Sequence, residues 1–125
     1  MKINKLVLVL SFLLLTLGLH RPVWAAPGAS AVVTANKRNV ILRLSGLRGL
    51  QSVAYDVVYT NKGKEEGISG VIRKPKTASA TRTFFMGTCS KNACTAHRNI
   101  TKGTVTVRFK DAAGVTTTKT ISLKF

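Results

Sequence analysis

Residues 53–59 read Val53-Ala54-Tyr55-Asp56-Val57-Val58-Tyr59, and their pattern is the clearest indication of the fold. Valine or tyrosine occupies every second position from 53 to 59, and alanine, aspartate and valine stand between them. A β-strand points successive side chains to opposite faces, so this alternation creates one apolar face and one more polar face. The stretch therefore predicts a β-strand with one side buried against a core.

The same alternation recurs along the chain and predicts further strands. It is clearest in residues 40–44, 105–109 and 121–125, and it is weaker in residues 31–35 and 69–73. Residues 83–89 predict another strand, although its facing is ambiguous because three large apolar residues are consecutive there. After residue 25, no apolar pattern with helical spacing continues for three turns. We therefore expect an all-β domain.

Turn-forming residues separate the predicted strands. Residues 61–67 contain two glycines, two lysines and two glutamates, and they predict a polar loop. Pro75 ends a strand because proline has no N–H to donate to a neighbouring strand. Residues 111–114 predict a hairpin turn, in which Gly114 can take the positive φ that such turns need.

About seven short strands at this spacing predict two antiparallel sheets packed face to face. Three segments carry a resemblance to known domains: residues 40–44 as a second strand, residues 55–59 as a third, and residues 103–107 leading into the last hairpin. Over residues 31–125 the chain resembles an immunoglobulin-like or fibronectin type III-like domain. The resemblance implies an immunoglobulin-like antiparallel β-sandwich. It implies no single activity, because this architecture serves many unrelated functions.

Residues 1–25 have the pattern of a helical secretory signal peptide. The pattern consists of a basic start, an apolar run and compact residues before the cleavage site: Lys2 and Lys5, residues 6–19, and Val23-Trp24-Ala25. Cleavage is predicted between Ala25 and Ala26. The alternative is an uncleaved membrane anchor, but the apolar run is shorter than the ~18 residues that a spanning helix usually needs. We expect a secreted, extracellular or periplasmic domain of residues 26–125, with no membrane span after cleavage.

The charge of the chain is strongly positive. Its 125 residues include 20 Lys and Arg but 4 Asp and Glu, which gives a formal net charge of +16. Loss of Lys2, Lys5 and Arg21 with the signal peptide would lower this charge to +13. So few carboxylates leave little material for acid–base catalysis or metal binding. A surface this basic attracts polyanions non-specifically and in a salt-dependent way.

Cys89 and Cys94 are the two cysteines of the chain. In an exported protein we expect them to form a disulfide, with the four intervening residues making a hairpin loop. The alternative is a metal site that uses Cys89, Cys94 and His97, but it would need a fourth ligand. A redox role fits less well, because the spacing is not Cys-x-x-Cys.

Basic residues on predicted strands and their ends are the candidate polyanion-binding residues. They are Arg43, Arg73, Lys74, Arg108, Lys110 and Lys124. Arg43, Arg108 and Lys110 project from the polar faces of predicted strands, where side chains can form a continuous patch.

The sequence thus predicts a secreted, non-catalytic binding or structural module without a cofactor. Its expected partner is an anionic polymer or cell-surface component, such as a cell-wall polymer, a polysaccharide or extracellular DNA. One alternative is a structural or adhesive module that contacts another protein through a sheet edge, with the charge incidental. A less favoured alternative is a small secreted hydrolase that uses His97 as a general base.

Overall fold

The computed structural model describes residues 26–125, which form nine β-strands and no helix. In chain order the strands are β1 (Gly28–Val33), β2 (Asn39–Ser45), β3 (Leu50–Asn61), β4 (Lys64–Arg73), β5 (Ala80–Phe85), β6 (Gly87–Ser90), β7 (Ala93–Ala96), β8 (Ile100–Asp111) and β9 (Thr116–Leu123). Every pairing between these strands is antiparallel. The prediction of an all-β, antiparallel fold is therefore confirmed.

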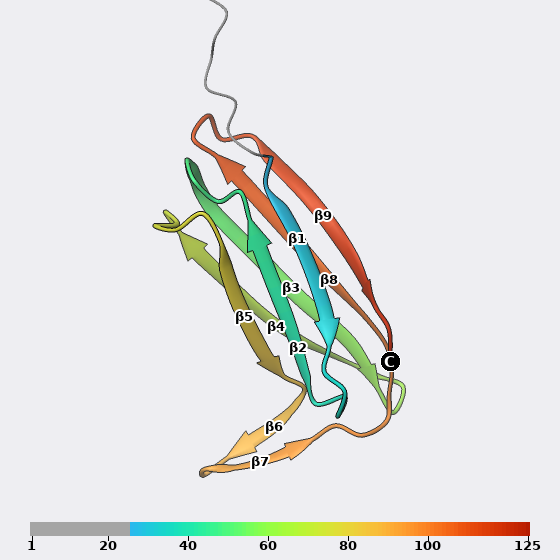
Figure 1. Ribbon diagram of the computed structural model, residues 1–125. Coiled ribbons are helices and arrows are strands. Elements are labelled where there is room, and N and C mark those ends of the chain that lie inside the picture. The colour runs from blue at the N-terminus through green and yellow to red at the C-terminus, as the bar shows by residue number, and fades with distance from the viewer. Residues whose placement is uncertain (1–25) are drawn as a thin grey trace, which may run out of the picture.

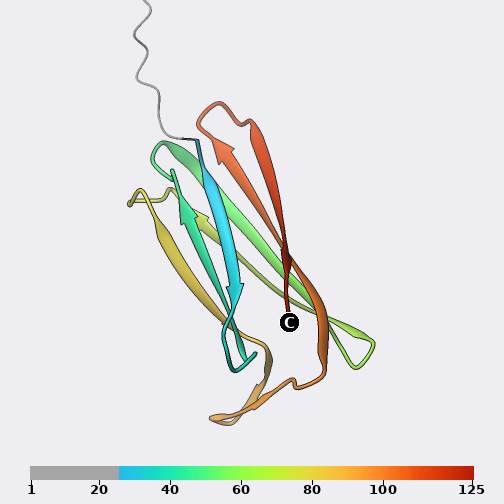
Figure 2. The ribbon, with the colours of Figure 1, turned by 45° about the vertical axis from the view of Figure 1, so that its right-hand side comes forward.

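Seven strands form two sheets, and the other two form a separate hairpin (Figure 1). The three-stranded sheet has the order β1-β2-β5, and the four-stranded sheet has the order β4-β3-β8-β9. β6 and β7 project from one end of the two sheets, as Figure 2 shows from a second direction. The β1–β2 and β3–β4 turns lie at the same end, which we call the hairpin end.

The two sheets enclose one hydrophobic core. Most of its buried residues occupy alternate positions of the central strands: Val40, Leu42 and Leu44 on β2, Val53, Tyr55, Val57 and Tyr59 on β3, and Val105, Val107 and Phe109 on β8. Burial of an aliphatic or aromatic side chain of this size contributes about 1.5–3 kcal/mol. The alternation in residues 53–59 therefore holds the sheets together, because every second side chain of β3 enters the core.

Tyr55 connects the two sheets near one edge. Its ring covers Gly70 on the neighbouring β4, where a Cβ atom would collide with the ring. The centroid of the Tyr55 ring also lies 5.2 Å from that of Phe84, on β5 of the opposite sheet. Aromatic pairs at this separation add to the stabilisation from burial alone. Glycine is thus needed at position 70 so that the tyrosine can approach the backbone.

Two segments differ from the prediction. Residues 65–67 lie within β4 and not in a loop, because β4 begins at Lys64 and pairs with β3 from there onwards. An edge strand accommodates such charged residues because one of its sides faces solvent. Residues 83–89 form two strands rather than one, because the chain changes direction at the fully buried Met86. This break, together with β7, gives nine strands where about seven were predicted.

The predicted signal peptide of residues 1–25 lies outside the described residues, and so does Ala25 of its cleavage site. Within residues 26–125, no helix is long and apolar enough to cross a membrane.

Candidate functional site

A row of side chains crosses the outer face of the four-stranded sheet. Arg73 on β4 pairs with Ser52 on β3, and Ser52 pairs in turn with Lys110 on β8. Directly opposed residues of antiparallel strands point to the same face of the sheet. Because the adjacent Val53 is in the core, Ser52 and both of its neighbours face outward. Two basic side chains therefore flank one short side chain.

The short side chains of β3 leave a groove between β4 and β8. The groove has a volume of about 420 Å³ and is lined by Gln51, Ser52, Val71, Arg73, Lys74 and Lys110. We call it the sheet groove. Three of its lining residues are basic and none is acidic. A concave surface with charge of one sign concentrates ions of the opposite sign, so the groove attracts anions.

Lys74 reaches the sheet groove because the chain turns sharply at the end of β4. Its backbone adopts a left-handed conformation with φ of 45°, and its N–H donates to the carbonyl oxygen of Gln51 at 2.9 Å. Pro75 follows and has no N–H with which to extend the strand pairing. This turn keeps Lys74 beside the start of β3, at Gln51, rather than in line with β4.

Arg108 lies on the same face, one row further along β8, where it pairs with Ala54. Its Nη2 donates to Oδ2 of Asp56 at 2.6 Å. A hydrogen bond from the Ser69 side chain and the bond from Arg108 both lower the pKa of Asp56. Asp56 is therefore ionised at neutral pH and already partners Arg108, whereas the three cations of the sheet groove have no ion-pair partner among residues 26–125.

The other two candidates lie elsewhere. Arg43 is exposed on the outer face of the three-stranded sheet, between Ser30 and Thr81 on the neighbouring strands. Lys124 follows the end of β9. The structure thus gathers Arg73, Lys74 and Lys110 around one groove. A continuous patch of Arg43 with Arg108 and Lys110 does not form, because their strands belong to different sheets.

The two cysteines form a disulfide within the projecting hairpin. Cys89 on β6 and Cys94 on β7 are directly paired, and their sulfur atoms are bonded. Both thiols are therefore unavailable for the alternative metal site with His97. In the part of the chain that the structure describes, no cluster of three or more potential metal ligands occurs. Such a disulfide is typical of proteins in oxidising compartments.

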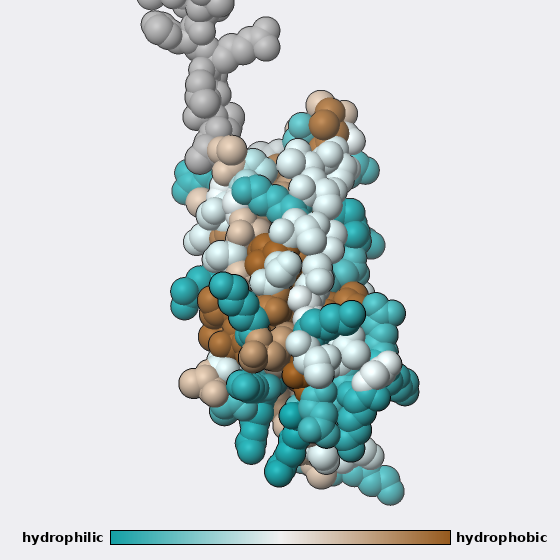
Figure 3. Space-filling view, turned by 90° about the vertical axis from the view of Figure 1, so that its right-hand side faces the viewer, coloured by the Kyte–Doolittle hydropathy of each residue, from teal (hydrophilic) through white to brown (hydrophobic). Residues whose placement is uncertain are grey.

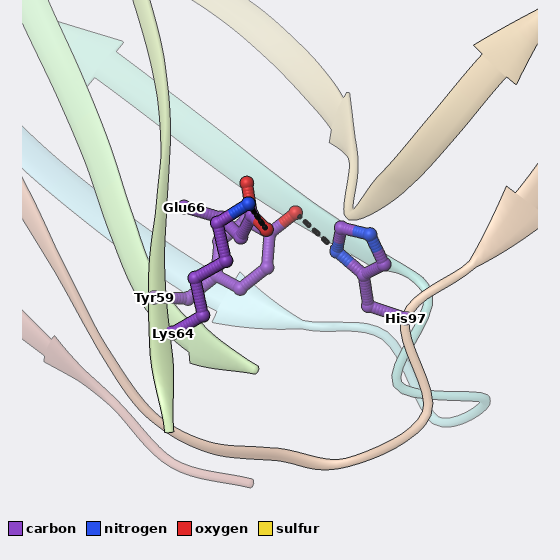
Figure 4. A network of polar contacts seen from close by, with 4 residues as sticks. All are labelled: Tyr59, Lys64, Glu66 and His97. Atoms are coloured by element: carbon purple, nitrogen blue, oxygen red, sulfur yellow. Dashed lines mark hydrogen bonds and ion pairs between the residues drawn. The ribbon is translucent and has the colours of Figure 1, made fainter. Parts of the chain in front are cut away.

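His97 has a buried tyrosine as its partner. The hydroxyl oxygen of Tyr59 lies 2.9 Å from Nδ1 of His97, and Figure 4 shows the two side chains pointing toward each other. Tyr59 is 3% exposed, and burial raises the pKa of its hydroxyl, with a smaller contribution from the charge of Glu66. Glu66 in turn lies 3.9 Å from Nζ of Lys64. The tyrosine therefore keeps its proton at neutral pH and orients the imidazole ring.

A second group of basic residues, outside the candidates taken from the sequence, surrounds His97. It consists of Lys37, Arg38, Lys62 and Arg98. These residues belong to three connections that are distant in the sequence and meet at the hairpin end. Sequence patterns place each of them in a loop, but they contain no signal that brings those loops together.

Comparison with protein-family models, curated proteins and solved structures finds no match to this chain. The geometry of the two basic surfaces is thus the basis for a functional assignment.

Proposed function

We propose that this protein is an exported, non-catalytic module that binds linear anionic polymers along the outer face of its four-stranded sheet. The observation that carries the proposal is the convergence of Arg73, Lys74 and Lys110 on one groove without an acidic neighbour in its lining. Cell-wall polymers, acidic polysaccharides and extracellular DNA all present the repeated negative charge that such a groove would bind.

The shape of the surface supports a polymer rather than a compact ligand. The sheet groove runs between two strands, and the row that follows it continues with Ala54 between Val71 and Arg108. Ala54, like Ser52, is small, so no long side chain of β3 obstructs this row. An extended chain can follow this row while its charged groups meet basic residues on both sides, and each contact would release counterions.

The strand order also supports the resemblance to immunoglobulin-like and fibronectin type III-like domains. The first, second and fifth strands share one sheet, and the third, fourth, eighth and ninth share the other. A core between two antiparallel sheets is the architecture that the resemblance implies. The exposed disulfide is consistent with an extracellular or periplasmic location.

The salt dependence of binding to duplex DNA, used as a model linear polyanion, tests the proposal. The variant Arg73→Gln/Lys110→Gln is compared with Arg43→Gln/Lys124→Gln, which loses the same charge outside the groove. We expect the groove variant to reduce the slope of log affinity against log salt by about 2, and the control to reduce it by less than about 1. Equal effects of the two variants on the slope, or failure of the protein to bind DNA at low salt, would contradict the groove as the binding surface.

A further inference from the structure

The hairpin end carries a second basic site, separate from the sheet groove. Two adjoining pockets share the segment from Ala96 to Arg98. The first has a volume of about 200 Å³ and includes Lys37 and Arg38 of the β1–β2 turn. The second has a volume of about 310 Å³ and includes Asn61 and Lys62 at the β3–β4 turn. Figure 3 shows hydrophilic side chains crowding this end of the molecule.

The charges around the first pocket favour an oxyanion. Lys37, Arg38 and Arg98 line it, and among the described residues that line either pocket no side chain is acidic. Its volume is below the ~300–1,000 Å³ of pockets that hold drug-sized ligands, so it suits one compact group. Arginine is well matched to phosphate and sulfate, because its planar guanidinium offers two parallel N–H donors.

Backbone hydrogen bonds hold the three basic connections in place. The N–H of Met86 donates to the carbonyl of Arg38 at 2.8 Å, and the N–H of His97 donates to the carbonyl of Met86 at 3.0 Å. On the other side, the N–H of Lys62 donates to the carbonyl of Asn99 at 3.3 Å. Because Met86 is fully buried, this series of bonds is attached to the core. Such pre-organisation lowers the entropic cost of binding.

His97 contributes a ring nitrogen between the two pockets. The hydroxyl oxygen of Tyr59 lies 2.9 Å from Nδ1 of His97, so this nitrogen is already engaged and the ring is held in place. His97 lines both pockets, so its second ring nitrogen, Nε2, is available to a hydrogen-bonding group of a ligand there. Tyr59 is thus a positioning residue for this site.

The second pocket has the neutral polar groups that bind hydroxyls. Asn61, Thr95 and Asn99 line it. Within residues 26–125, Oδ1 of Asn61 is a buried side-chain acceptor without a hydrogen-bond partner. That atom has almost no solvent-accessible surface, so ligand hydroxyls would pair with the other amide and hydroxyl groups of the lining, which can donate and accept hydrogen bonds. Sugars supply several such hydroxyls.

We propose that the hairpin end binds a sugar that carries a phosphate or sulfate ester. The ester lies in the first pocket among Lys37, Arg38 and Arg98, and the sugar hydroxyls lie in the second pocket beside Asn61. The proposal is independent of polymer binding in the sheet groove, because the two sites share no lining residue.

The disulfide stabilises one wall of this site. Thr95 and Ala96 line the second pocket and follow Cys94 directly on β7. All residues from Thr88 to Thr95 are exposed, so the core does not hold this strand in place. The bond between Cys94 and Cys89 ties β7 to β6 immediately before the pocket wall. Reduction of the disulfide is therefore expected to raise the Kd for the sugar ester while the hydrophobic core stays folded.

Titration of the whole protein with glucose 6-phosphate, followed by amide chemical shifts in NMR, tests this site. We expect the largest shifts at residues 37, 38, 62, 97 and 98. Arg38→Gln/Arg98→Gln should raise the Kd by roughly tenfold or more, because two charge-assisted hydrogen bonds are lost. The matched control Arg73→Gln/Lys110→Gln should leave this Kd unchanged, although it impairs DNA binding.

Two further ligands define the chemistry. Glucose 6-sulfate should bind at the same residues, and the comparison of the two esters shows which oxyanion is preferred. Inorganic phosphate should bind roughly threefold or more weakly than glucose 6-phosphate, because it lacks the hydroxyls that pair with the neutral polar lining of the second pocket. Equal affinity for inorganic phosphate would overturn the sugar assignment. Absence of shifts at the hairpin end with either ester, or an unchanged Kd in Arg38→Gln/Arg98→Gln, would overturn the site itself.

Discussion

Arg108 and Asp56 are 52 residues apart in the sequence, yet Nη2 of the arginine lies 2.6 Å from Oδ2 of the aspartate. They meet because β8 and β3 are neighbours, and their positions differ by one outward-facing row. The side chains of Arg108 and Asp56 remain 43% and 32% exposed. Asp56 therefore neutralises the charge of Arg108, which leaves Arg73, Lys74 and Lys110 as the cations available to a ligand in the sheet groove.

Ionisation of Asp56 should make the free energy of unfolding depend on pH in the acid range. The pKa of Asp56 is lowered from its ordinary value of 3.8, first by the Ser69 hydrogen bond and then by Arg108. Its contribution is thus present above the unfolded-state pKa and lost as pH falls through the folded-state pKa. We expect Asp56→Asn to cost about 1 kcal/mol or less at pH 6, because the pair is exposed, and to cost less at pH 3. Urea denaturation at the two pH values measures this, and an equal cost at both would contradict it.

Removal of Asp56 should also strengthen polyanion binding. Asp56→Asn releases Arg108 from its partner on the face that carries the sheet groove. Glu65→Gln is a matched control, because it removes one exposed negative charge from a more distant row of the same face. We expect a larger gain in DNA affinity at low salt for Asp56→Asn than for Glu65→Gln. If the gains were the same, net charge alone would explain them.

Tyr59 should destabilise the protein at alkaline pH. Burial raises the pKa of its hydroxyl above 10.0. A group of this kind contributes stability below its unfolded-state pKa, and the contribution is lost as pH rises through the folded-state pKa. The Tm should therefore fall less steeply between pH 8 and pH 11 in Tyr59→Phe than in the wild type. At pH 8 the variant should be about 1 kcal/mol less stable, because Nδ1 of His97 loses its hydrogen-bond partner. Parallel curves for the two proteins would refute this role.

The disulfide should contribute little to global stability. It closes a loop with a sequence separation of 5, in a hairpin whose paired cysteines are exposed. The loop-entropy estimate is then about 2 kcal/mol at most. We expect Cys89→Ser/Cys94→Ser to fold and to lose no more than this amount in urea denaturation. A protein that fails to fold without the disulfide would show that the hairpin is part of the core.

Charged residues on the inner side of edge strands should keep the protein monomeric. Glu66 on β4, Arg82 on β5 and Lys119 on β9 pair with the buried Tyr59, Leu42 and Val107, so each points toward the core side of its sheet. Inward-pointing charges on edges oppose pairing with another chain. We expect Lys119→Val to promote association in light scattering, whereas Thr118→Val on the outer side of β9 should have a smaller effect. Equal association of both variants would indicate general surface stickiness.

Local patterns were sufficient to predict most strands. The alternation in residues 40–44, 53–59 and 105–109 predicted which side chains are buried, because the two-residue period of a strand is a local property. The pairing of Cys89 with Cys94 was also predicted from the sequence, because they are the two cysteines of a chain with an export signal and four residues between them fit a hairpin loop. The pattern was less informative for β4, an edge strand in which solvent accommodates Glu65 and Glu66.

The alternating strands, the basic charge and the disulfide could be predicted from the sequence, because each depends on residues that are close in the chain or on composition. Which basic residues share a surface depends instead on the tertiary structure. Arg73 and Lys110 meet across Ser52 through the register of three strands, whereas Arg43 lies on the other sheet. The cations around His97 come together in the same way, through backbone hydrogen bonds between distant loops. Register and sheet order arise from contacts between residues far apart in the chain, so no local pattern contains them.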